Sequence, residues 1–277
     1  MIRNELVSRS IDYIIQHIDE DISIEDVANH CHFSKYYFSR VFKAETGESI
    51  YSFIKRLKME QSAINLKLVK ERSITDIGSD YGYSASNYSS AFKKHHSISP
   101  AEFRKATNTT CVPHPFYPDR DASFRTFEEY DKQIQVKELE DLVVIFERYI
   151  GNYIELGKNW SDFTEKYKAY IKEDTLLIER FYDDPAVTGV YQCLYDICMT
   201  VDKSCTLDNV TTIEGGRFAV YRFEGAIEEI FPALQGIFNI WLANSGYEMD
   251  ERYGLDIYRA VDREKMCVVM DLCIPVK

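Results

Sequence analysis

The sequence lacks any long apolar segment. No uninterrupted run among its 277 residues approaches the length of about 18 that a membrane-spanning helix requires. A secretory signal is also missing, because Met1 to Asn4 lead straight into an amphipathic helical pattern. We therefore expect a cytoplasmic protein without a membrane partner.

A paired set of cysteines is absent as well. The chain has seven cysteines, an odd number, and they do not show the spacing of a zinc site. Cys198 and Cys273 each lie within an apolar segment, which favours buried, reduced thiols over the alternatives of metal binding or redox sensing. We therefore expect no metal and no cofactor.

An excess of basic residues is lacking too, since the formal net charge is −12. Residues 1–107 hold 15 Lys and Arg against 14 Asp and Glu, whereas residues 108–277 hold 18 against 31. The acidic C-terminal half should repel the phosphates of a nucleic acid. Only the N-terminal half is therefore a candidate for binding one.

Proline is scarce except in one place. Three of the seven prolines, Pro113, Pro115 and Pro118, lie in a polar stretch without hydrophobic periodicity, which is typical of a semi-rigid linker. The length of the chain suits two domains. We place these domains at residues 1–106 and 124–277, with the linker at 107–123.

The N-terminal half contains an internal repeat. Residues 23–55 recur at 73–105, and ten of these 33 positions are identical, against a chance rate of about one in fifteen. The identical pairs are Ser23/Ser73, Ile24/Ile74, Asp26/Asp76, Ser34/Ser84, Ser39/Ser89, Phe42/Phe92, Lys43/Lys93, Ser49/Ser99, Phe53/Phe103 and Lys55/Lys105. Two copies of one structural unit are expected.

Each copy is predicted to form a short helix, a tight turn and a longer helix. Ser-Ile-x-Asp at residues 23–26 and 73–76 is a capping pattern for the first helix. Ser34 and Ser84 are predicted to cap the second helix, in which apolar residues recur at i, i+3 and i+4. The inward residues are Phe38, Val41 and Phe42 in one copy and Tyr88, Ala91 and Phe92 in the other. This arrangement is a helix-turn-helix, and two of them indicate two DNA-reading units.

A long helix is predicted between the copies, from Ile50 to about Leu68, because this stretch lacks Pro and Gly and has apolar residues at helical spacing. Twenty helical residues span about 30 Å, close to the ~34 Å of one DNA turn. An opening amphipathic helix and a closing helix from Ser99 complete an all-α domain of seven helices.

The motifs of this half identify a family. Residues 4 to about 106 resemble the DNA-binding domain of AraC/XylS-family transcription regulators. The resemblance rests on Asp26-Val-Ala, Phe33-Ser-Lys-Tyr-Tyr-Phe-Ser-Arg-Val-Phe-Lys, Thr46-Gly, Tyr81-Gly-Tyr, Ala91-Phe-Lys-Lys and Ser99-Pro-Ala-Glu-Phe-Arg. It implies a regulator whose two recognition helices enter adjacent major-groove segments of double-stranded promoter DNA, with RNA polymerase as a further partner.

The outer face of each recognition helix supplies the candidate DNA contacts. Arg40 is the strongest candidate for base reading, because a guanidinium group can bridge O6 and N7 of guanine. Ser90 takes the equivalent position in the second copy, which predicts weaker sequence reading there. Lysines on these faces are candidate phosphate ligands. The full set is Lys35, Tyr36, Ser39, Arg40, Lys43, Ser86, Asn87, Ser90, Lys93 and Lys94.

The C-terminal half also repeats, more faintly. In each copy a buried strand leads to an aromatic amphipathic helix, then to a Gly-initiated strand and a closing strand. We predict the strands at Leu142–Tyr149, Gly189–Tyr191, Asp196–Val201, Arg217–Phe223, Gly254–Tyr258 and Asp271–Val276. This order predicts an α+β domain of two pseudo-symmetric β-α-β-β modules with a cleft between them.

This half resembles the GyrI-like effector-binding domain, on the motifs Ile213-Glu-Gly-Gly-Arg-Phe-Ala-Val-Tyr, Ser245-Gly-Tyr, Asp256-Ile-Tyr and Leu272-Cys-Ile-Pro-Val. The resemblance implies a sensor, of the kind used in multidrug sensing, with an aromatic cleft for lipophilic or cationic compounds and a carboxylate at its floor. The family's acidic position falls on Asp256, which is one methylene shorter than Glu. The candidate effector ligands are Tyr191, Tyr195, Tyr221, Trp241, Asp256 and Tyr258.

Three functions remain open from the sequence. The leading hypothesis is a transcription regulator controlled by a small effector in the C-terminal cleft. Alternatively, the C-terminal domain is a GyrI-like hydrolase in which Asp256 and Tyr258 imitate a Glu and Tyr pair, or a protein-interaction module without a small ligand. The sequence does not indicate a nucleophile with an adjacent base, so we assign no catalytic residue.

Overall fold

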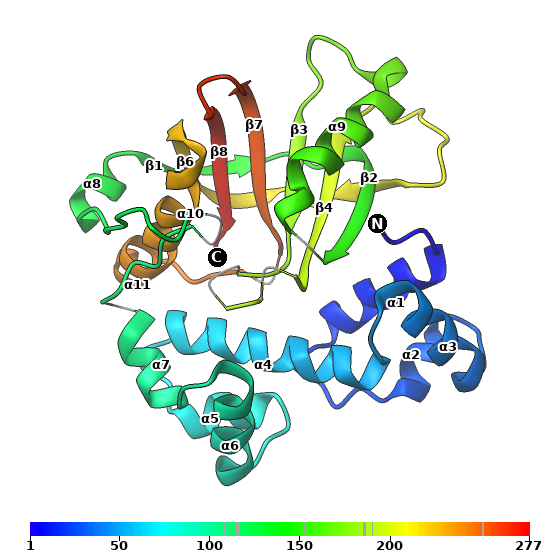
Figure 1. Ribbon diagram of the computed structural model, residues 1–277, viewed down its shortest axis with the longest axis vertical. Coiled ribbons are helices and arrows are strands. Elements are labelled where there is room, and N and C mark those ends of the chain that lie inside the picture. The colour runs from blue at the N-terminus through cyan, green and yellow to red at the C-terminus, as the bar shows by residue number, and fades with distance from the viewer. Residues whose placement is uncertain (108, 115–116, 152, 185–186, 190, 251) are drawn as a thin grey trace. The chain divides into compact units, whose positions relative to one another are not determined.

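The computed structural model describes residues 1–107, 109–114, 117–151, 153–184, 187–189, 191–250 and 252–277. The chain divides into two compact units, Met1–Thr109 and Thr110–Lys277. The first unit is helical and the second is built on a β-sheet (Figure 1). None of the described helices combines the length and the apolar character needed to cross a membrane.

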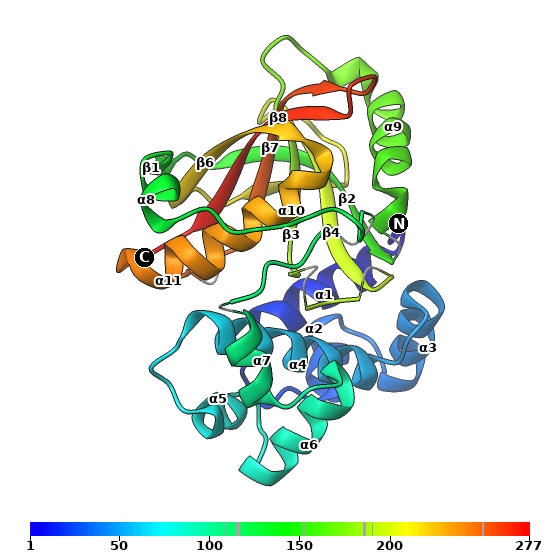
Figure 2. The ribbon, with the colours of Figure 1, turned by 60° about the vertical axis from the view of Figure 1, so that its left-hand side comes forward.

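The helices of the first unit follow the fifty-residue repeat of the sequence. Helices α2 and α3 recur as α5 and α6 with the same lengths, and the predicted α4 joins the two pairs, which lie toward its opposite ends (Figures 1 and 2). The helices are α1 Glu5–Gln16, α2 Ile24–His30, α3 Lys35–Thr46, α4 Ile50–Leu68, α5 Ile74–Asp80, α6 Ala85–His96 and α7 Pro100–Thr107. The predicted all-α domain with two helix-turn-helix units is confirmed.

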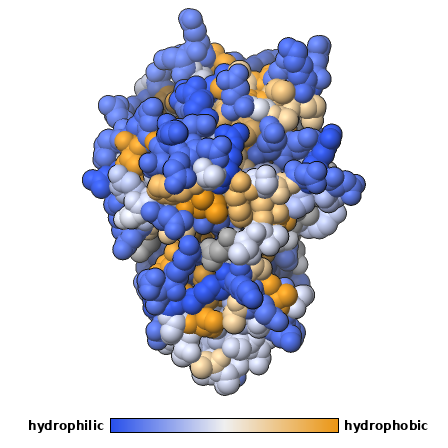
Figure 3. Space-filling model, turned by 90° about the vertical axis from the view of Figure 1, so that its left-hand side faces the viewer, coloured by the Kyte–Doolittle hydropathy of each residue, from blue (hydrophilic) through white to orange (hydrophobic). Residues whose placement is uncertain are grey.

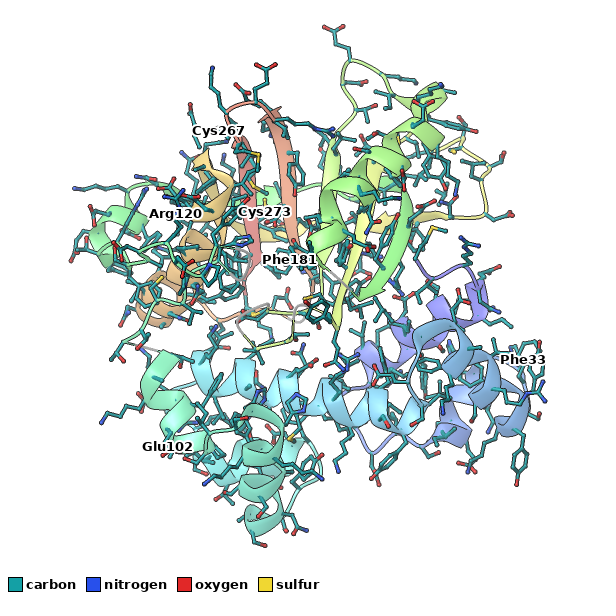
Figure 4. The ribbon with its side chains drawn as sticks, in the orientation of Figure 1. Phe33, Glu102, Arg120, Phe181, Cys267 and Cys273 are labelled. Atoms are coloured by element: carbon teal, nitrogen blue, oxygen red, sulfur yellow. The ribbon has the colours of Figure 1, made fainter. Side chains whose placement is uncertain are left out.

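Local caps set where several of these helices begin. The Ser23 side chain accepts a hydrogen bond from the backbone of Asp26, whose carboxylate accepts one from the backbone of Ser23. Ser99 and Glu102 form the same reciprocal pair at the start of α7, where Figure 4 labels Glu102. Ser84 takes the predicted position before α6 but makes no capping bond with its side chain.

Aromatic residues form the core of this unit. Phe38, Phe42, Tyr88 and Phe92 are buried as predicted, while Val41 and Ala91 are only partly covered. The ring of Phe42 packs edge-on against Phe53 of α4 with centroids 5.3 Å apart. Fifty residues later, Phe92 packs in the same way against Phe103 of α7, at 5.4 Å. The repeat therefore preserves a tertiary contact as well as the helices.

The two recognition helices end in the same backbone conformation but with different residue types. Both end in a left-handed residue, Gly47 with φ 81° after α3 and Ser97 with φ 66° after α6. A residue with a side chain is strained there by about 1–2 kcal/mol.

Ser97→Gly should therefore raise the free energy of unfolding of the first unit by about 1 kcal/mol. Denaturant unfolding followed by helical circular dichroism measures the change. Gly47→Ser is the matched control and should lower stability by a similar amount; a destabilising Ser97→Gly would contradict the prediction.

The second unit alternates strands with short helices. Its first half contains α8 Phe127–Asp131, β1 Ile134–Leu139, β2 Leu142–Gly151, η1 Tyr153–Glu155, α9 Leu156–Lys166, η2 Lys168–Tyr170, β3 Leu177–Phe181, β4 Cys193–Thr200 and β5 Val210–Ile213. Its second half contains β6 Gly216–Ala226, α10 Ile227–Gly236, the π-helical turn η3 Ile237–Leu242, α11 Ala243–Ser245, β7 Gly254–Asp262 and β8 Cys267–Pro275.

The strands form one antiparallel sheet in the order β1-β6-β8-β7-β3-β4-β2-β5. Exchanging β2–α9–β3–β4 with β6–α10–β7–β8, and β1 with β5, gives the same order read from the opposite edge of the sheet. A pseudo-twofold axis therefore passes between the central strands β3 and β7, where Glu179 lies directly opposite Asp256. The predicted pair of β-α-β-β modules is confirmed.

Side chains alternate between the two faces of the sheet. On one face, Phe163 of α9 packs into a cluster with Tyr195 and Ile197 of β4, and α10 covers the same face in the other module (Figure 2). On the other face, the curved sheet brings together Val144 of β2 and Phe218 of β6. Outside these cores, hydrophilic residues cover most of the surface shown in Figure 3.

The strand predicted at Gly189–Tyr191 is wrong. Gly189 and Tyr191 lie outside any strand, and Val190 is outside the described residues. The strand that takes this place in the module is β3, and β1 and β5 were also missed. Strand β3 was missed because Glu179 and Arg180 interrupt its apolar pattern in the sequence. In the structure both residues are buried, with exposures of only 1% and 8%. Their burial depends on partners distant in the chain.

Part of the stretch predicted as a linker packs on the second unit. The backbone of Val112 donates to Gln235 Oε1 of α10 at 3.1 Å and accepts from Gln235 Nε2 at 2.6 Å. His114 is buried beside Phe231. Pro115 lies outside the described residues.

A buried ionic cluster joins three strands on the face opposite α9. Asp196 of β4 is fully buried. Its Oδ1 accepts from Arg148 Nε at 2.8 Å, and its Oδ2 accepts from Arg180 Nε at 2.9 Å and from the Tyr182 hydroxyl at 2.6 Å. One buried carboxylate therefore pairs with two arginines at once.

Candidate functional sites

The first candidate site is the outer face of α3. Tyr36, Arg40 and Lys43 lie at i, i+4 and i+7 and are exposed, Tyr36 by 85%. Lys35 is exposed as well and pairs with Glu25 of α2 at 2.5 Å, whereas Ser39 is half-buried. This face combines a guanidinium, two ammonium groups and a phenol, which suits contact with bases and phosphates.

The equivalent face of α6 is smaller and less basic at its centre. Ser86, Asn87, Ser90, Lys93 and Lys94 are all exposed. The Ser90 hydroxyl donates to the backbone oxygen of Ser86 at 3.1 Å, so it is partly engaged within the helix. Lys93 and Lys94 place two ammonium groups near the end of the helix, which suits contact with phosphates.

Helix α4 is tied to both helix-turn-helix units. Arg56 of α4 is buried and donates from Nη2 to Glu48 Oε1, at the end of the turn after α3, at 2.7 Å. His96 at the end of α6 lies 3.5 Å from the Met59 backbone oxygen of α4. Burial lowers the pKa of His96 to about 4, with the neighbouring His95 adding to the effect. His96 is therefore neutral near pH 7 and acts as a packing residue.

The second candidate site is a pocket at the pseudo-twofold axis of the sheet. Glu179 of β3 and Asp256 of β7 form its floor as a cross-strand pair, 1% and 6% exposed. Glu179 accepts hydrogen bonds from the hydroxyls of Tyr153 and Tyr258. Asp256 Oδ1 is buried without a hydrogen-bond partner among the described residues.

Aromatic rings form much of the pocket wall. Tyr195 stacks on Tyr149 with an interplanar angle of 11° and meets Tyr153 edge-on at 5.1 Å. Phe181, labelled in Figure 4, crosses over β7 at Gly254. A Cβ atom at Gly254 would lie 1.9 Å from this ring, so only glycine fits there. The lining is Tyr153, Glu179, Phe181, Asp183, Cys193, Leu194, Tyr195, Leu234 and Asp256.

The pKa values of the two carboxyl groups at the pocket floor, Glu179 and Asp256, are both raised. Burial raises the pKa of Glu179 to about 7, although the hydroxyls of Tyr153 and Tyr258 oppose the shift. Burial, and then the charge of Glu179, raise the pKa of Asp256 well above its usual range. Because the two groups interact, they titrate as a pair.

The pocket is nearly closed in this conformation. It encloses about 30 Å³, whereas pockets for drug-sized ligands hold about 300–1,000 Å³. Any larger ligand must displace wall residues such as Leu234 of α10 or Tyr153 of η1. A larger ligand therefore requires these wall side chains to move.

The structure brings together three of the six predicted effector ligands. Tyr195 and Asp256 line the pocket, and Tyr258 donates to its floor. Tyr191 lies in a turn and is 67% exposed. Two others lie in the second module near α8: Tyr221 accepts from Arg125 at 2.9 Å, and Trp241 donates to Asp131 at 2.9 Å.

Sequence reasoning missed Glu179 and Tyr153. Glu179 belongs to the strand that was assigned incorrectly, and Tyr153 follows β2 without a recognisable motif. The sequence carried half of the signal, the two similar closing strands, and the structure supplied the strand pairing that completes it. Ile197 and Leu272 are equivalent in the near-identical closing strands, and they pair with Glu179 and Asp256 respectively. The internal symmetry therefore maps one carboxyl onto the other.

Two family models match the chain. Residues 132–277 match the GyrI-like small molecule binding domain, and residues 27–106 match a helix-turn-helix domain. In the part of the chain that the structure describes, no three His, Cys, Asp or Glu side chains gather as a metal site would require.

Curated relatives match between 33% and 39% of this chain. Regulatory protein SoxS of Salmonella typhimurium is 30% identical over 105 residues, which are 38% of this chain and 97% of SoxS. In the same organism, Regulatory protein PocR is 31% identical over 108 residues, 39% of this chain and 35% of PocR. Transcriptional regulator Rob is 35% identical over 92 residues, 33% of this chain and 32% of Rob. The chain thus spans about a third of PocR and of Rob.

Proposed function

Because the chain belongs to the AraC-type transcription regulators with a GyrI-like small-molecule binding domain, we propose that it binds promoter DNA through α3 and α6 and senses a small effector in the pocket of Glu179 and Asp256. The effector is an aromatic or lipophilic cation. RNA polymerase is the protein partner. Since the matched relatives are named as regulators, the pocket serves binding rather than catalysis.

The observation that carries the effector proposal is the pair of buried carboxyls facing aromatic walls. An ionised carboxylate is costly to bury without a cation or donors, and Asp256 Oδ1 has no donor among the described residues. A ligand ammonium group supplies both charge and donors. The faces of Tyr153 and Tyr195 supply flat apolar surface and attract cations through their ring quadrupoles.

The DNA proposal rests on the exposed faces of α3 and α6 and on the helix that separates them. Nineteen residues of α4 span about 28 Å, close to the ~34 Å between successive major-groove faces. Arg40 reads bases in the first groove segment. The lysines of both helices contact phosphates, and α6 contributes less sequence discrimination than α3.

Effector binding controls the regulator by shifting its conformational populations. The pocket holds too little volume for an aromatic ligand when closed, so the ligand favours an open state of the second unit. Regulation then requires that DNA or polymerase binding differ between the open and closed states.

A charge-matched pair of probes tests the effector proposal. 4-(Aminomethyl)benzyl alcohol carries one positive charge, and 1,4-benzenedimethanol is its neutral counterpart. In the full chain the amino alcohol should bind about 10- to 100-fold more tightly, the effect of one hydrogen bond to a charged group. Equal affinities by calorimetry would remove the cation from the proposal.

The affinity for the amino alcohol should increase with pH up to about 7. Below this pH the Glu179 and Asp256 pair holds a proton that the cation must displace, so the affinity increases by up to tenfold per pH unit.

Glu179→Gln should flatten this pH dependence and weaken binding of the amino alcohol. Glu147→Gln is the matched control, because Glu147 is also buried on this face but does not line the pocket. If the affinity of Glu179→Gln for the amino alcohol depends on pH as in the parent chain, Glu179 is not the group at the pocket floor that the cation contacts.

A further inference from the structure

Helix α10 contacts both the pocket and the chain segment that joins the two units. Leu234 lines the pocket. The next residue, Gln235, is 3% exposed, and its side-chain amide both accepts from and donates to the backbone of Val112. Val112 belongs to residues 110–114, which we call the strap and which lie beside α10 (Figure 2). The strap begins directly after Thr109, the last residue of the first unit.

Leu234 is the least restrained of the described wall residues. Six of these nine residues lie on strands β3, β4 and β7. Of the other three, Tyr153 donates a hydrogen bond to Glu179, and Asp183 accepts one from the backbone of Leu194. The side chain of Leu234 is apolar and only half-buried. A ligand that enlarges the pocket therefore displaces Leu234 more easily than the rest of the wall.

The helix is irregular on both sides of Leu234. Pro232 lies two residues before it, inside α10, and cannot donate the backbone hydrogen bond of a helix interior. The π-helical turn Ile237–Leu242 begins three residues after it. Helices bend at prolines and at π-helical turns. The short segment 233–236 can therefore shift while the rest of the helix stays in place.

We propose that the strap is a latch: the hydrogen bonds between Val112 and Gln235 hold segment 233–236 against the pocket, and an effector that displaces Leu234 releases them. This inference rests on the proposed effector pocket and adds how its occupation reaches the chain between the two units. Binding has to break the latch, so the apparent affinity falls in proportion to the fraction of molecules in which the pocket is open.

The strap can be released without leaving buried polar groups unpaired. Val112 is 44% exposed, so water can replace the amide of Gln235 as the partner of its backbone. Cys111, the preceding residue, is partly covered, and burial raises the pKa of its thiol to about 11. Release exposes this thiol, which makes Cys111 a reporter of the latch.

Gln235→Met tests the latch, because methionine is also unbranched and cannot form the two hydrogen bonds. The full-chain variant should bind both 4-(aminomethyl)benzyl alcohol and 1,4-benzenedimethanol about fivefold more tightly or better, the effect of two hydrogen bonds at the low end of their usual strength. The ratio of the two affinities by calorimetry should stay as in the parent chain, because the latch carries no charge. Gln133→Met, at an exposed position outside the pocket and the strap, should change neither affinity.

Alkylation of Cys111 by N-ethylmaleimide gives a second measurement, on the parent chain. Saturating amino alcohol should accelerate it by at least about threefold and by up to about 100-fold, because the thiolate fraction rises tenfold for each unit by which the thiol pKa falls. Cys205 is also partly covered and lies between β4 and β5. It should react at an unchanged rate, and peptide mass spectrometry separates the two sites.

The outcomes separate the latch from the cation pocket. The latch is excluded if Gln235→Met tightens neither probe, or if the amino alcohol does not accelerate alkylation of Cys111; Leu234 then moves by rotation of its side chain alone. A preference for the amino alcohol over the diol would still support the cation pocket. If the two probes bind equally but both expected changes occur, the latch stands and the cation is excluded. If neither probe binds, both proposals fail. If Gln235→Met does not fold, the Cys111 rates in the parent chain decide.

Discussion

Asp196→Asn should lower the free energy of unfolding of the second unit by about 3–5 kcal/mol. This is the typical cost of removing one partner from a buried ion pair, because the remaining charge stays in a site without water. Here two guanidinium groups, Arg148 and Arg180, lose their shared carboxylate, and they are only 1% and 8% exposed. Denaturant unfolding followed by aromatic circular dichroism measures the loss.

The contribution of Asp196 should depend on pH in a defined direction. Burial alone would raise the pKa of Asp196, but Arg148 and Arg180 outweigh it and lower the pKa to about 2. A folded-state pKa below the unfolded value of about 3.9 means that the stabilisation is present above pH 4. It is lost as the pH falls toward 2, so the difference between parent and variant should narrow in that window.

The pseudo-symmetry of the sheet provides a control. Asp271 of β8 corresponds to Asp196 and also contacts two arginines, Arg222 and Arg259. The side chains of these arginines are 57% and 37% exposed, so water can solvate them when the carboxylate is removed. Asp271→Asn should therefore cost only about 1 kcal/mol. Equal losses in the two variants would show that burial of the arginines is not the cause.

Arg40→Ala should reduce the preference for specific over scrambled DNA by about 5- to 150-fold, the range that corresponds to losing one bidentate contact with guanine. The specific site can be obtained by selecting bound duplexes from a random pool with the full chain. Titration of specific and scrambled duplexes at fixed salt then gives the ratio. The fold should be unaffected, because Arg40 is exposed.

Lys43→Ala distinguishes base reading from simple loss of positive charge. It should weaken binding to both duplexes alike and reduce the slope of log affinity against log salt by about 1. Ser90→Ala on α6 should change the preference little. If Arg40→Ala behaves like Lys43→Ala, Arg40 contacts phosphate and does not read sequence.

The helical unit was predicted closely because its signals are local. The bounds of α4 agree with the predicted Ile50 to Leu68, since apolar spacing and the cap at Ser49 lie within one segment. The repeat provided a second copy of the same evidence. Only details that depend on neighbouring elements differed, such as the partial exposure of Val41.

The two β-α-β-β modules of the second unit were predicted correctly, but the central strand β3 was missed. Strands β2, β4, β6, β7 and β8 carry apolar patterns, and they were found. Strand β3 carries Glu179 and Arg180 on opposite faces, each buried by a partner far away in the sequence. Charge in a strand indicates exposure unless those partners are known, so the residue opposite Asp256 was missed.

The sequence by itself determined the two helix-turn-helix units, the outer residues of α3 and α6 and the presence of two related β-α-β-β modules. Caps, apolar periodicity and internal repetition are properties of neighbouring residues, and they can be read before folding. The tertiary structure decided the pocket. Strand register places Glu179 opposite Asp256 and brings Tyr153 and Asp183 to the same cavity, because hydrogen bonding between distant strands, rather than local preference, sets which side chains meet.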